Sequence, residues 1–316
     1  MSKKMQSNIL LLITAFIWGS AFVAQKSGMD YIEPFTYNGI RTFIGGLVLI
    51  PVILIMNRGK AKPEETELTE EEQAAKAAQN KLLIIGGICC GAALFVASSL
   101  QQFGVSYTTA GKAGFITTLY VVIVPIISVI IGKKVRPIMW LCVIMGAVGL
   151  YLLCMTDASF KLKFGDMLVL LCAFAFSLHI MIIDHFSPKV DGVKLSCIQF
   201  LFAGLLGIIC MFIFEKPVIS DICDAGGTIL YAGIMSCGAA YTLQILGQKY
   251  TNPTLATLLM SLESVFAAIA GWLILKETMG VREIVGCVLI FAAIVVSQLN
   301  PGKKAGAQEL PLRRKR

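Results

Sequence analysis

Residues 254–277 read TLATLLMSLESVFAAIAGWLILKE and decide the fold class. About 20 apolar residues, rising about 1.5 Å each, cover a hydrocarbon core of about 30 Å, so this stretch predicts a membrane-crossing helix. Glu263 lies near its middle. An acid at that depth costs about 2.5–3.5 kcal/mol on insertion scales, so its side chain must face protein or water. Two roles for Glu263 stay open: a buried hydrogen bond between helices, or a group that binds a substrate or coupling ion.

Composition assigns the whole chain to the same class. Of its 316 residues, 57% are hydrophobic and only 15% are charged, whereas soluble domains carry about 25% charged residues. We therefore expect an all-α polytopic membrane protein with ten transmembrane helices. The predicted spans are residues 9–25, 35–56, 82–103, 110–131, 137–154, 164–183, 193–214, 226–246, 254–275 and 281–299.

Basic residues indicate how the chain crosses the membrane. With a cytoplasmic N-terminus, 19 of the 27 Lys and Arg residues fall in cytoplasmic segments. The bias predicts that both termini are cytoplasmic, and it accounts for the net charge of +8 without a nucleic-acid partner. Segment 57–81 is predicted to be an acidic cytoplasmic insert, where Thr69 and Glu72 have capping-box spacing for a short helix. Residues 301–316 are predicted to form a disordered, basic cytoplasmic tail that contacts anionic lipid.

The chain also contains a weak internal repeat. Shifts of 158 residues in the first two spans and of 143 in the next two place similar residues on one another. The matched positions include Trp18 with Phe176, Arg41 with Gln199, Gln101 with Gln244, and Tyr120 with Glu263. We infer two five-helix repeats, residues 1–156 and 157–300. Because five is odd, the second copy enters the membrane from the opposite side, an inverted repeat typical of secondary transporters.

Polar side chains inside the spans are the candidates for function. The planar guanidinium of Arg41 suits a carboxylate or phosphate, and a structural, carbonyl-bonded arginine is the alternative. Tyr120 takes the place of Glu263 in the first repeat, and Pro125 after it predicts a kink. The candidate substrate-binding or coupling residues are Glu263, Arg41, Tyr120, Gln101, Gln244, Trp18, Thr117 and Ser261.

No catalytic or cofactor pattern accompanies these residues. The sequence lacks a phosphate-binding GxxxxGK[ST] loop, a dinucleotide glycine pattern and HExxH. His179 and Asp184 fall on different helix faces, so we expect no metal site there. The ten cysteines, apart from Cys223, lie in apolar runs and are predicted to be small core residues. We expect no cofactor, no catalysis, and transport that draws on a gradient.

Four stretches carry a family resemblance: AFIWGSAFVAQK at 15–26, YNGIRTFIGG at 37–46, GKAGFITTLYVVIVP at 111–125 and SLESVFAAIAGWLILKE at 261–277. Together they resemble the drug/metabolite transporter superfamily, EamA type. The resemblance implies an inner-membrane carrier of two inverted repeats whose cavity is lined by the first four helices of each. It also implies transport of amino acids, other metabolites or drugs without ATP. The chain departs from it at Lys134, the counterpart of Glu277, where members often carry an acid.

The sequence therefore predicts a secondary carrier that exports small amino-acid-like or drug-like metabolites by alternating access. Its expected partners are the metabolite, the lipid bilayer, and a proton or other coupling ion, with the oligomeric state left open. Two alternatives come from other classes. One is a non-transporting membrane receptor or regulatory scaffold, and the weaker one is an intramembrane enzyme.

Overall fold

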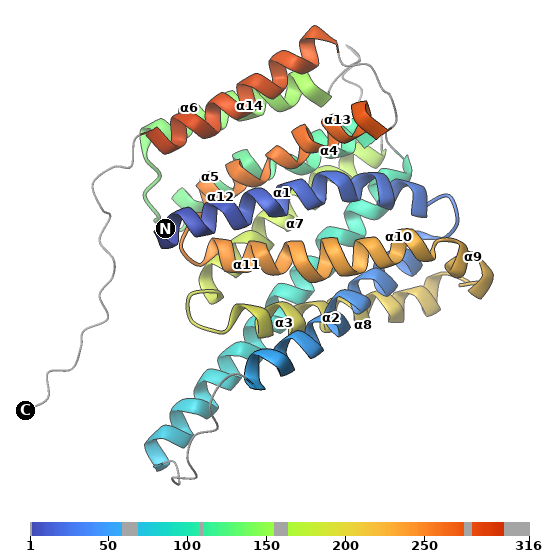
Figure 1. Ribbon diagram of the computed structural model, residues 1–316, viewed down its shortest axis with the longest axis vertical. Coiled ribbons are helices and arrows are strands. Elements are labelled where there is room, and N and C mark those ends of the chain that lie inside the picture. The colour runs from blue at the N-terminus through green and yellow to red at the C-terminus, as the bar shows by residue number, and fades with distance from the viewer. Residues whose placement is uncertain (1, 59–68, 108–109, 155–163, 275–279, 300–316) are drawn as a thin grey trace, which may run out of the picture.

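The computed structural model describes residues 2–58, 69–107, 110–154, 164–274 and 280–299, and these residues form helices and no strands. The elements are α1 (Lys3–Gly28), α2 (Pro34–Arg58), α3 (Glu70–Tyr107), α4 (Ala110–Thr118), α5 (Tyr120–Ile130), α6 (Pro137–Cys154), α7 (Phe164–Phe186), α8 (Gly192–Phe214), α9 (Ile219–Asp224), α10 (Gly226–Tyr231), the π-helix η1 (Ala232–Tyr241), α11 (Thr242–Gln248), α12 (Pro253–Met260), α13 (Leu262–Ile274) and α14 (Val281–Leu299). Figure 1 shows them as one bundle.

Most of these helices match the predicted spans. Seven helical stretches in the described part are long and apolar enough to cross a membrane, and two shorter apolar stretches lie at Pro137–Leu153 and Pro253–Ile269. The all-α membrane class is confirmed, whereas the number of ten spans stays a prediction. The predicted tail, Glu277 and residues 59–68 of the polar insert lie outside the described residues.

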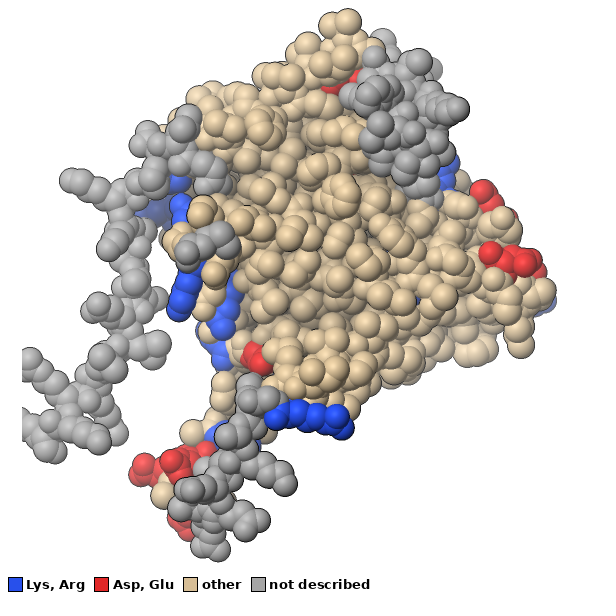
Figure 2. Space-filling view, viewed as in Figure 1, with Lys and Arg blue, Asp and Glu red and all other residues tan. Residues whose placement is uncertain are grey.

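The surface of the bundle is that of a protein in lipid. Large apolar side chains stay exposed on many helices, such as Phe16 at 59%, Ile130 at 77% and Phe212 at 70%. Water would disfavour such a continuous apolar surface. Figure 2 shows a broad belt without charge, with Lys and Arg gathered at the end of the bundle that carries the N-terminus.

The predicted capping box forms at the start of α3. The hydroxyl of Thr69 accepts a hydrogen bond from the Glu72 amide at 3.3 Å, and the Glu72 carboxylate accepts one from the Thr69 amide at 3.0 Å. The helix that follows is not a separate short element. It runs unbroken as α3 into the predicted third span and projects beyond the bundle (Figure 1).

Equivalent helices of the two halves pack side by side in opposite directions. On α2 and α8, Gly39 lies against Gly207 and Phe43 against Gly204, so residue numbers rise along one helix as they fall along the other. A Cβ atom on Gly204 would lie 2.6 Å from the Phe43 Cα, which is why the backbones can approach only through glycine. The last helices of the halves, α6 and α14, also pair this way (Figure 1). Opposite running of equivalent helices is the geometry of an inverted repeat.

Glu215 ties the α2–α8 pair together at one end. Its carboxylate follows the last residue of α8 and accepts hydrogen bonds from the amides of Phe35 and Thr36 at 2.7 and 2.6 Å. The Thr36 hydroxyl donates a third at 2.7 Å. These amides belong to the first turn of α2, which has no partners of its own for them. An acid from α8 therefore caps α2.

Glycine contacts show the same relation in the remaining helices. Gly104 of α3 lies against Val169 of α7, and Gly247 of α11 lies against Leu11 of α1. The glycines are 143 residues apart in the sequence, and their neighbours Leu11 and Val169 are 158 apart. Both offsets are those of the predicted repeat. The two halves therefore place equivalent residues in equivalent contacts.

The two halves differ by one residue at η1. Gly91 of α3 lies against the Gln199 carbonyl, and Gly233 of η1 lies against the Arg41 carbonyl. This pair of glycines is 142 residues apart, one fewer than the later pair. Segment Ala232–Tyr241 therefore carries one extra residue relative to α3, and the wider i→i+5 turns of a π-helix accommodate it.

The predicted fourth and ninth spans are each broken in the middle. Leu119 separates α4 from α5, and Ser261 separates α12 from α13. The interruption in the first half lies at Leu119, not at Pro125, through which α5 continues. Broken helices of this kind leave backbone groups free near mid-membrane and are frequent at transporter binding sites. Here both breaks adjoin the tyrosine–glutamate pair described next.

Candidate functional site

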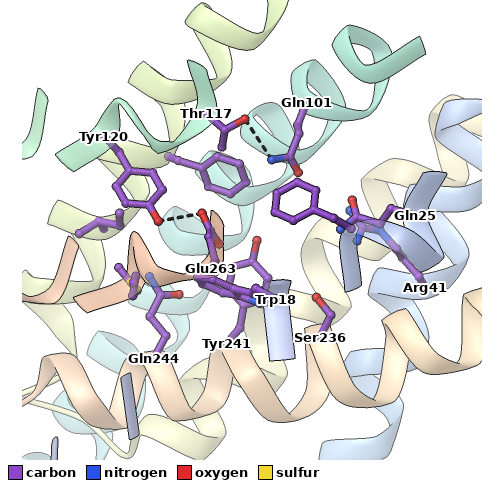
Figure 3. A pocket seen from close by; sticks show the side chains of 14 residues that line it. Trp18, Gln25, Arg41, Gln101, Thr117, Tyr120, Ser236, Tyr241, Gln244 and Glu263 are labelled. Carbon is purple, nitrogen blue, oxygen red and sulfur yellow. Dashed lines mark hydrogen bonds between the residues drawn. The ribbon is translucent and has the colours of Figure 1, made fainter. Parts of the chain in front are cut away.

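A cavity lies among the helices, between the two breaks (Figure 3). It takes residues from α1, α2, α3, α4, α5, α7, η1, α11, α12 and α13, whereas α6, α8 and α14 contribute none. The lining residues are Trp18, Phe22, Gln25, Arg41, Gln101, Thr117, Tyr120, Phe176, Ile180, Ser236, Tyr241, Gln244, Met260 and Glu263.

Glu263 is held by residues of the other half of the chain. The Tyr120 hydroxyl donates to Glu263 Oε1 at 2.9 Å, and the Thr118 hydroxyl lies 3.5 Å from the same oxygen. The Thr118 hydroxyl also lies 3.3 Å from that of Ser264, beside the carboxylate. Glu263 is 4% exposed, and its carboxyl faces the cavity (Figure 3). The hydroxyl donors beside the carboxyl and the cavity in front of it reduce the cost of burying an acid.

Arg41 lies at another end of the cavity, next to Gln25 and away from the tyrosine–glutamate pair (Figure 3). Its Nε and one terminal nitrogen donate to the Asn38 side-chain oxygen at 3.3 and 3.1 Å. The guanidinium also lies over the Tyr37 ring at 5.5 Å. Asn38 in turn donates to Ser98 at 2.9 Å. The arginine is thus oriented by neutral groups while buried at 4% exposure.

Neither charge is neutralised by a partner among the described residues. The one ion pair formed in that part of the chain joins Lys133 and Asp184, away from the cavity. Burying an unpaired charge is expensive, and proteins normally pair such groups or use them. The cavity therefore contains Arg41 and Glu263 at separate places, neither of them in an ion pair with another described residue.

Neutral polar groups and aromatic rings also line the cavity. The Gln101 amide donates to the Thr117 hydroxyl at 3.3 Å. The Gln244 side-chain oxygen and the Trp18 indole nitrogen are buried without a protein partner. The Trp18 and Tyr241 rings meet edge to face with centroids 4.5 Å apart. Buried polar atoms are nearly always bonded, so these two are available to water or a ligand.

Seven of the eight predicted candidates line this one cavity: Glu263, Arg41, Tyr120, Gln101, Gln244, Trp18 and Thr117. Ser261 does not, because its hydroxyl donates to the Leu258 carbonyl at 2.8 Å inside the helix break. The binding or coupling role of all eight stays a prediction. Sequence reasoning missed the other lining residues, which are Phe22, Gln25, Phe176, Ile180, Ser236, Tyr241 and Met260.

The repeat could have located several of the missed residues. Most of the lining consists of counterparts from the two halves, at offsets of 158 or 143. The pairs are Trp18 with Phe176, Phe22 with Ile180, Gln101 with Gln244, Thr117 with Met260, and Tyr120 with Glu263. Most residues predicted in one half thus indicate a lining residue from the other half, and Arg41, whose counterpart Gln199 does not line the cavity, is an exception. The cavity therefore lies on the axis that relates the two repeats.

Comparison with known proteins identifies the family. The model of the EamA-like transporter family matches residues 5–155 and again residues 163–298. The chain belongs to the EamA-like transporter family. The two matched ranges agree with the two repeats. Membership of the family identifies the protein as a multi-pass membrane transporter, without its substrate or direction. As the family resemblance implies, α6 and α14 lie outside the cavity lining, but α8, the second helix of the second half, also contributes no lining residue, contrary to that expectation.

Relatives of this EamA-like chain are known from archaea, bacteria and plants. An uncharacterized transporter of Archaeoglobus fulgidus is 29% identical over 94% of this chain and 87% of its own length. The uncharacterized transporter YoaV of Bacillus subtilis is 22% identical over 91% and 94%. The chloroplastic WAT1-related protein At3g02690 of Arabidopsis thaliana is 23% identical over 93% and 69%. A solved structure titled "Crystal structure of protein" has the same fold, with a TM-score of 0.73, 20% identity, and coverage of 93% of this chain and 96% of that one.

Proposed function

We propose that the protein is a secondary active transporter that exports small amino-acid-like or drug-like metabolites by alternating access, without ATP and without catalysis. The observation that supports this most is the cavity with Arg41 and Glu263 buried, unpaired and at separate places. A solute with opposite charges at matching positions would neutralise both.

The chemistry of the lining favours an amino-acid-like solute. The guanidinium of Arg41 presents a planar fork suited to a carboxylate. Glu263 is the complementary group for an ammonium. Between them, Trp18, Phe22 and Tyr241 supply apolar ring surface for the body of the solute. An α-amino acid with an apolar side chain combines these three features, and so does a small amphiphilic drug.

The arrangement of the halves supports alternating access. Two units that run in opposite directions have two equivalent ways to pack, one open to each side of the membrane. Glu263 and Tyr120 are repeat counterparts that meet beside both helix breaks. A carboxyl at that meeting point would bind a proton or the solute ammonium in turn, which couples transport to a gradient.

The orientation in the membrane completes the proposal. Both termini lie in the cytoplasm, and the protein resides in the cell (inner) membrane. The basic residues gathered at the N-terminal end of the bundle support this side as the cytoplasmic one (Figure 2). In that orientation the cavity end at Gln25 and Arg41 points away from the cytoplasm.

Solute flux tests the proposal directly. The purified full-length protein is reconstituted in vesicles, a proton gradient is imposed, and a labelled mixture of the twenty L-amino acids is followed. A carrier produces gradient-driven movement and counterflow against unlabelled solute. Comparing metabolites inside and outside overexpressing and deleted cells then identifies the solute. Accumulation outside the overexpressing cells is the expected sign of export.

Two outcomes would contradict the proposal. Saturable binding of a solute without any counterflow would favour the receptor or scaffold alternative. Conversion of the solute during incubation would favour an enzyme. A carrier of another solute class is separated from both by the metabolite comparison, because depletion or accumulation of any compound reveals it.

A further inference from the structure

The cavity extends toward only one end of the bundle. Gln25 and Arg41 line it, but their counterparts at the offset of 158, Ile183 and Gln199, do not. Both counterparts are 0% exposed. The helix of Gln199, α8, contributes no lining residue at all. The lining thus contains five counterpart pairs and four further residues, Gln25 and Arg41 from the first half and Ser236 and Tyr241 from the second. The end of the cavity at Gln25 and Arg41 has no equivalent at Ile183 and Gln199.

At the closed end, a buried polar pair lacks part of its hydrogen bonding. His179 Nε2 lies 3.1 Å from Gln199 Oε1, and the oxygen can only accept, so Nε2–H donates. His179 Nδ1 and Gln199 Nε2 have no partner, although both residues are 0% exposed. Nearly all buried polar atoms in proteins are satisfied. An unused acceptor beside an unused donor marks a place built for a third group.

One contact beside Arg41 recurs beside Gln199. In the first half, the Asn38 amide, which accepts from Arg41 through its oxygen, lies 3.4 Å from the Ser99 hydroxyl of α3. In the second half, Ser196 stands at the counterpart of Asn38, and its hydroxyl lies 2.7 Å from the hydroxyl of Thr242, the counterpart of Ser99. Gln199 therefore lies beside a polar contact that the repeat offsets relate to one beside Arg41.

Tyr241 separates the pair from the cavity. Its ring faces Trp18 of the cavity at 4.5 Å, and on another side it lies 6.1 Å from the His179 ring. Tyr241 is also the last residue of η1, where the extra residue of the second half lies. Such π segments often occur at functional sites. A change of helical register there would move Tyr241 and join His179 to the cavity.

We propose that His179 and Gln199 bind the polar head of the solute when the cavity opens at the opposite end of the bundle, as Arg41 does at this end. The inference rests on the proposed carrier function. The free Gln199 amide matches a carboxylate oxygen, and the free imidazole nitrogen matches an ammonium or hydroxyl. The solute exchanges a charged partner for an uncharged amide as it crosses.

Labelling from the two faces tests the exposure. Cysteine is introduced in the full-length protein as Gln25→Cys, Ile183→Cys or Gln199→Cys, and vesicles of known orientation are treated with a membrane-impermeant maleimide. Peptide mass spectrometry then reports each site. Gln25→Cys should react from one face, and the other two variants from the opposite face. The native Cys142, at 0% exposure, and the exposed Cys223 are the unreactive and reactive controls.

The ion pair at the closed end provides a matched perturbation. Lys133, after α5, pairs with Asp184 of α7, next to Ile183. Lys133→Glu places like charges there, and a part-exposed pair of this kind should shift labelling of Ile183→Cys about two- to fivefold upward. The charge swap Lys133→Asp with Asp184→Lys should restore the original rate.

Kinetics test the binding. With the labelled amino-acid mixture, Gln199→Leu should raise KM on its own face about tenfold or more and leave KM on the Arg41 face unchanged. A merely structural residue would alter both faces together.

The inference is overturned if Ile183→Cys and Gln199→Cys never react, even with Lys133→Glu, or if they react from the same face as Gln25→Cys. An equal rise of KM on both faces also overturns it. Labelling needs no solute, so its failure is distinct from an absence of counterflow, which would instead contradict the proposed function.

Discussion

Replacing Glu263 by glutamine separates charge from shape at the centre of the cavity. The glutamine oxygen can still accept from Tyr120, whose hydroxyl donates to Oε1 at 2.9 Å. Hydrogen bonds to charged groups contribute about 1.5–3 kcal/mol and neutral ones about 0.5–1.5, so the variant loses about 1 kcal/mol there. It also avoids the cost of an acid in the membrane, about 2.5–3.5 kcal/mol. We therefore expect folding and insertion to be unimpaired.

Transport should behave differently. Removing one charge of a buried ion pair with a solute costs about 2–5 kcal/mol. At about 1.4 kcal/mol per factor of ten, this weakens solute binding from about 30-fold to several thousandfold. The assay is gradient-driven flux of labelled amino acids in vesicles, with a thermal melt of the detergent-purified protein beside it. Glu283→Gln is the control, because that acid on α14 lies outside the cavity lining. A fully active Glu263→Gln variant would refute a role for this carboxyl in the mechanism.

Three further substitutions have expected outcomes. Arg41→Gln should weaken counterflow of carboxylate-bearing solutes at least about 30-fold. Arg41→Lys keeps the charge but not the planar fork, so its counterflow should fall between that of Arg41→Gln and that of the wild type. Equal KM values for the wild type and both variants would contradict carboxylate binding. Gly204→Ala should lower the melting temperature, since the new Cβ would lie 2.6 Å from the Phe43 backbone and overpacking costs about 1–3 kcal/mol. Gly114→Ala is the control, because no atom lies within 4 Å of the new Cβ, and it should leave the melting temperature unchanged. Glu215→Ala should cost about 1–2 kcal/mol of stability by removing the cap of α2, with solute KM unchanged; an unaltered melting temperature would show that water replaces the cap.

The sequence predicted the fold well because lipid leaves few choices. Long charge-free runs must be helices that satisfy their own backbone groups. The capping box at Thr69 and Glu72 was predictable for a different reason, because it depends only on a spacing of three residues within the sequence. What spacing could not show is the continuity of α3, because the acidic insert and the span are both good helix formers and nothing between them ends a helix.

The candidate site was predictable where charge or repeat offsets marked it. Glu263 and Arg41 stand out because charges are rare in spans, and the repeat leads from Glu263 to Tyr120. Tyr241 has no such signal, since a buried tyrosine in an apolar run reads as packing. The break at Leu119 was also not predicted, because by residue type proline at position 125 is the stronger helix breaker.

In the alternating-access cycle proposed above, the single added residue of η1 would make the two orientations of the empty carrier unequal in free energy. Identical halves would exchange roles at no cost, so each orientation would be populated equally. Among the described helices, the wider i→i+5 turns occur in η1 of the second half and not in its counterpart α3, so the exchange would not be symmetric. We therefore expect the unloaded protein to favour one side of the membrane, and deleting one residue between Ala232 and Tyr241 should bring the two populations closer to one to one.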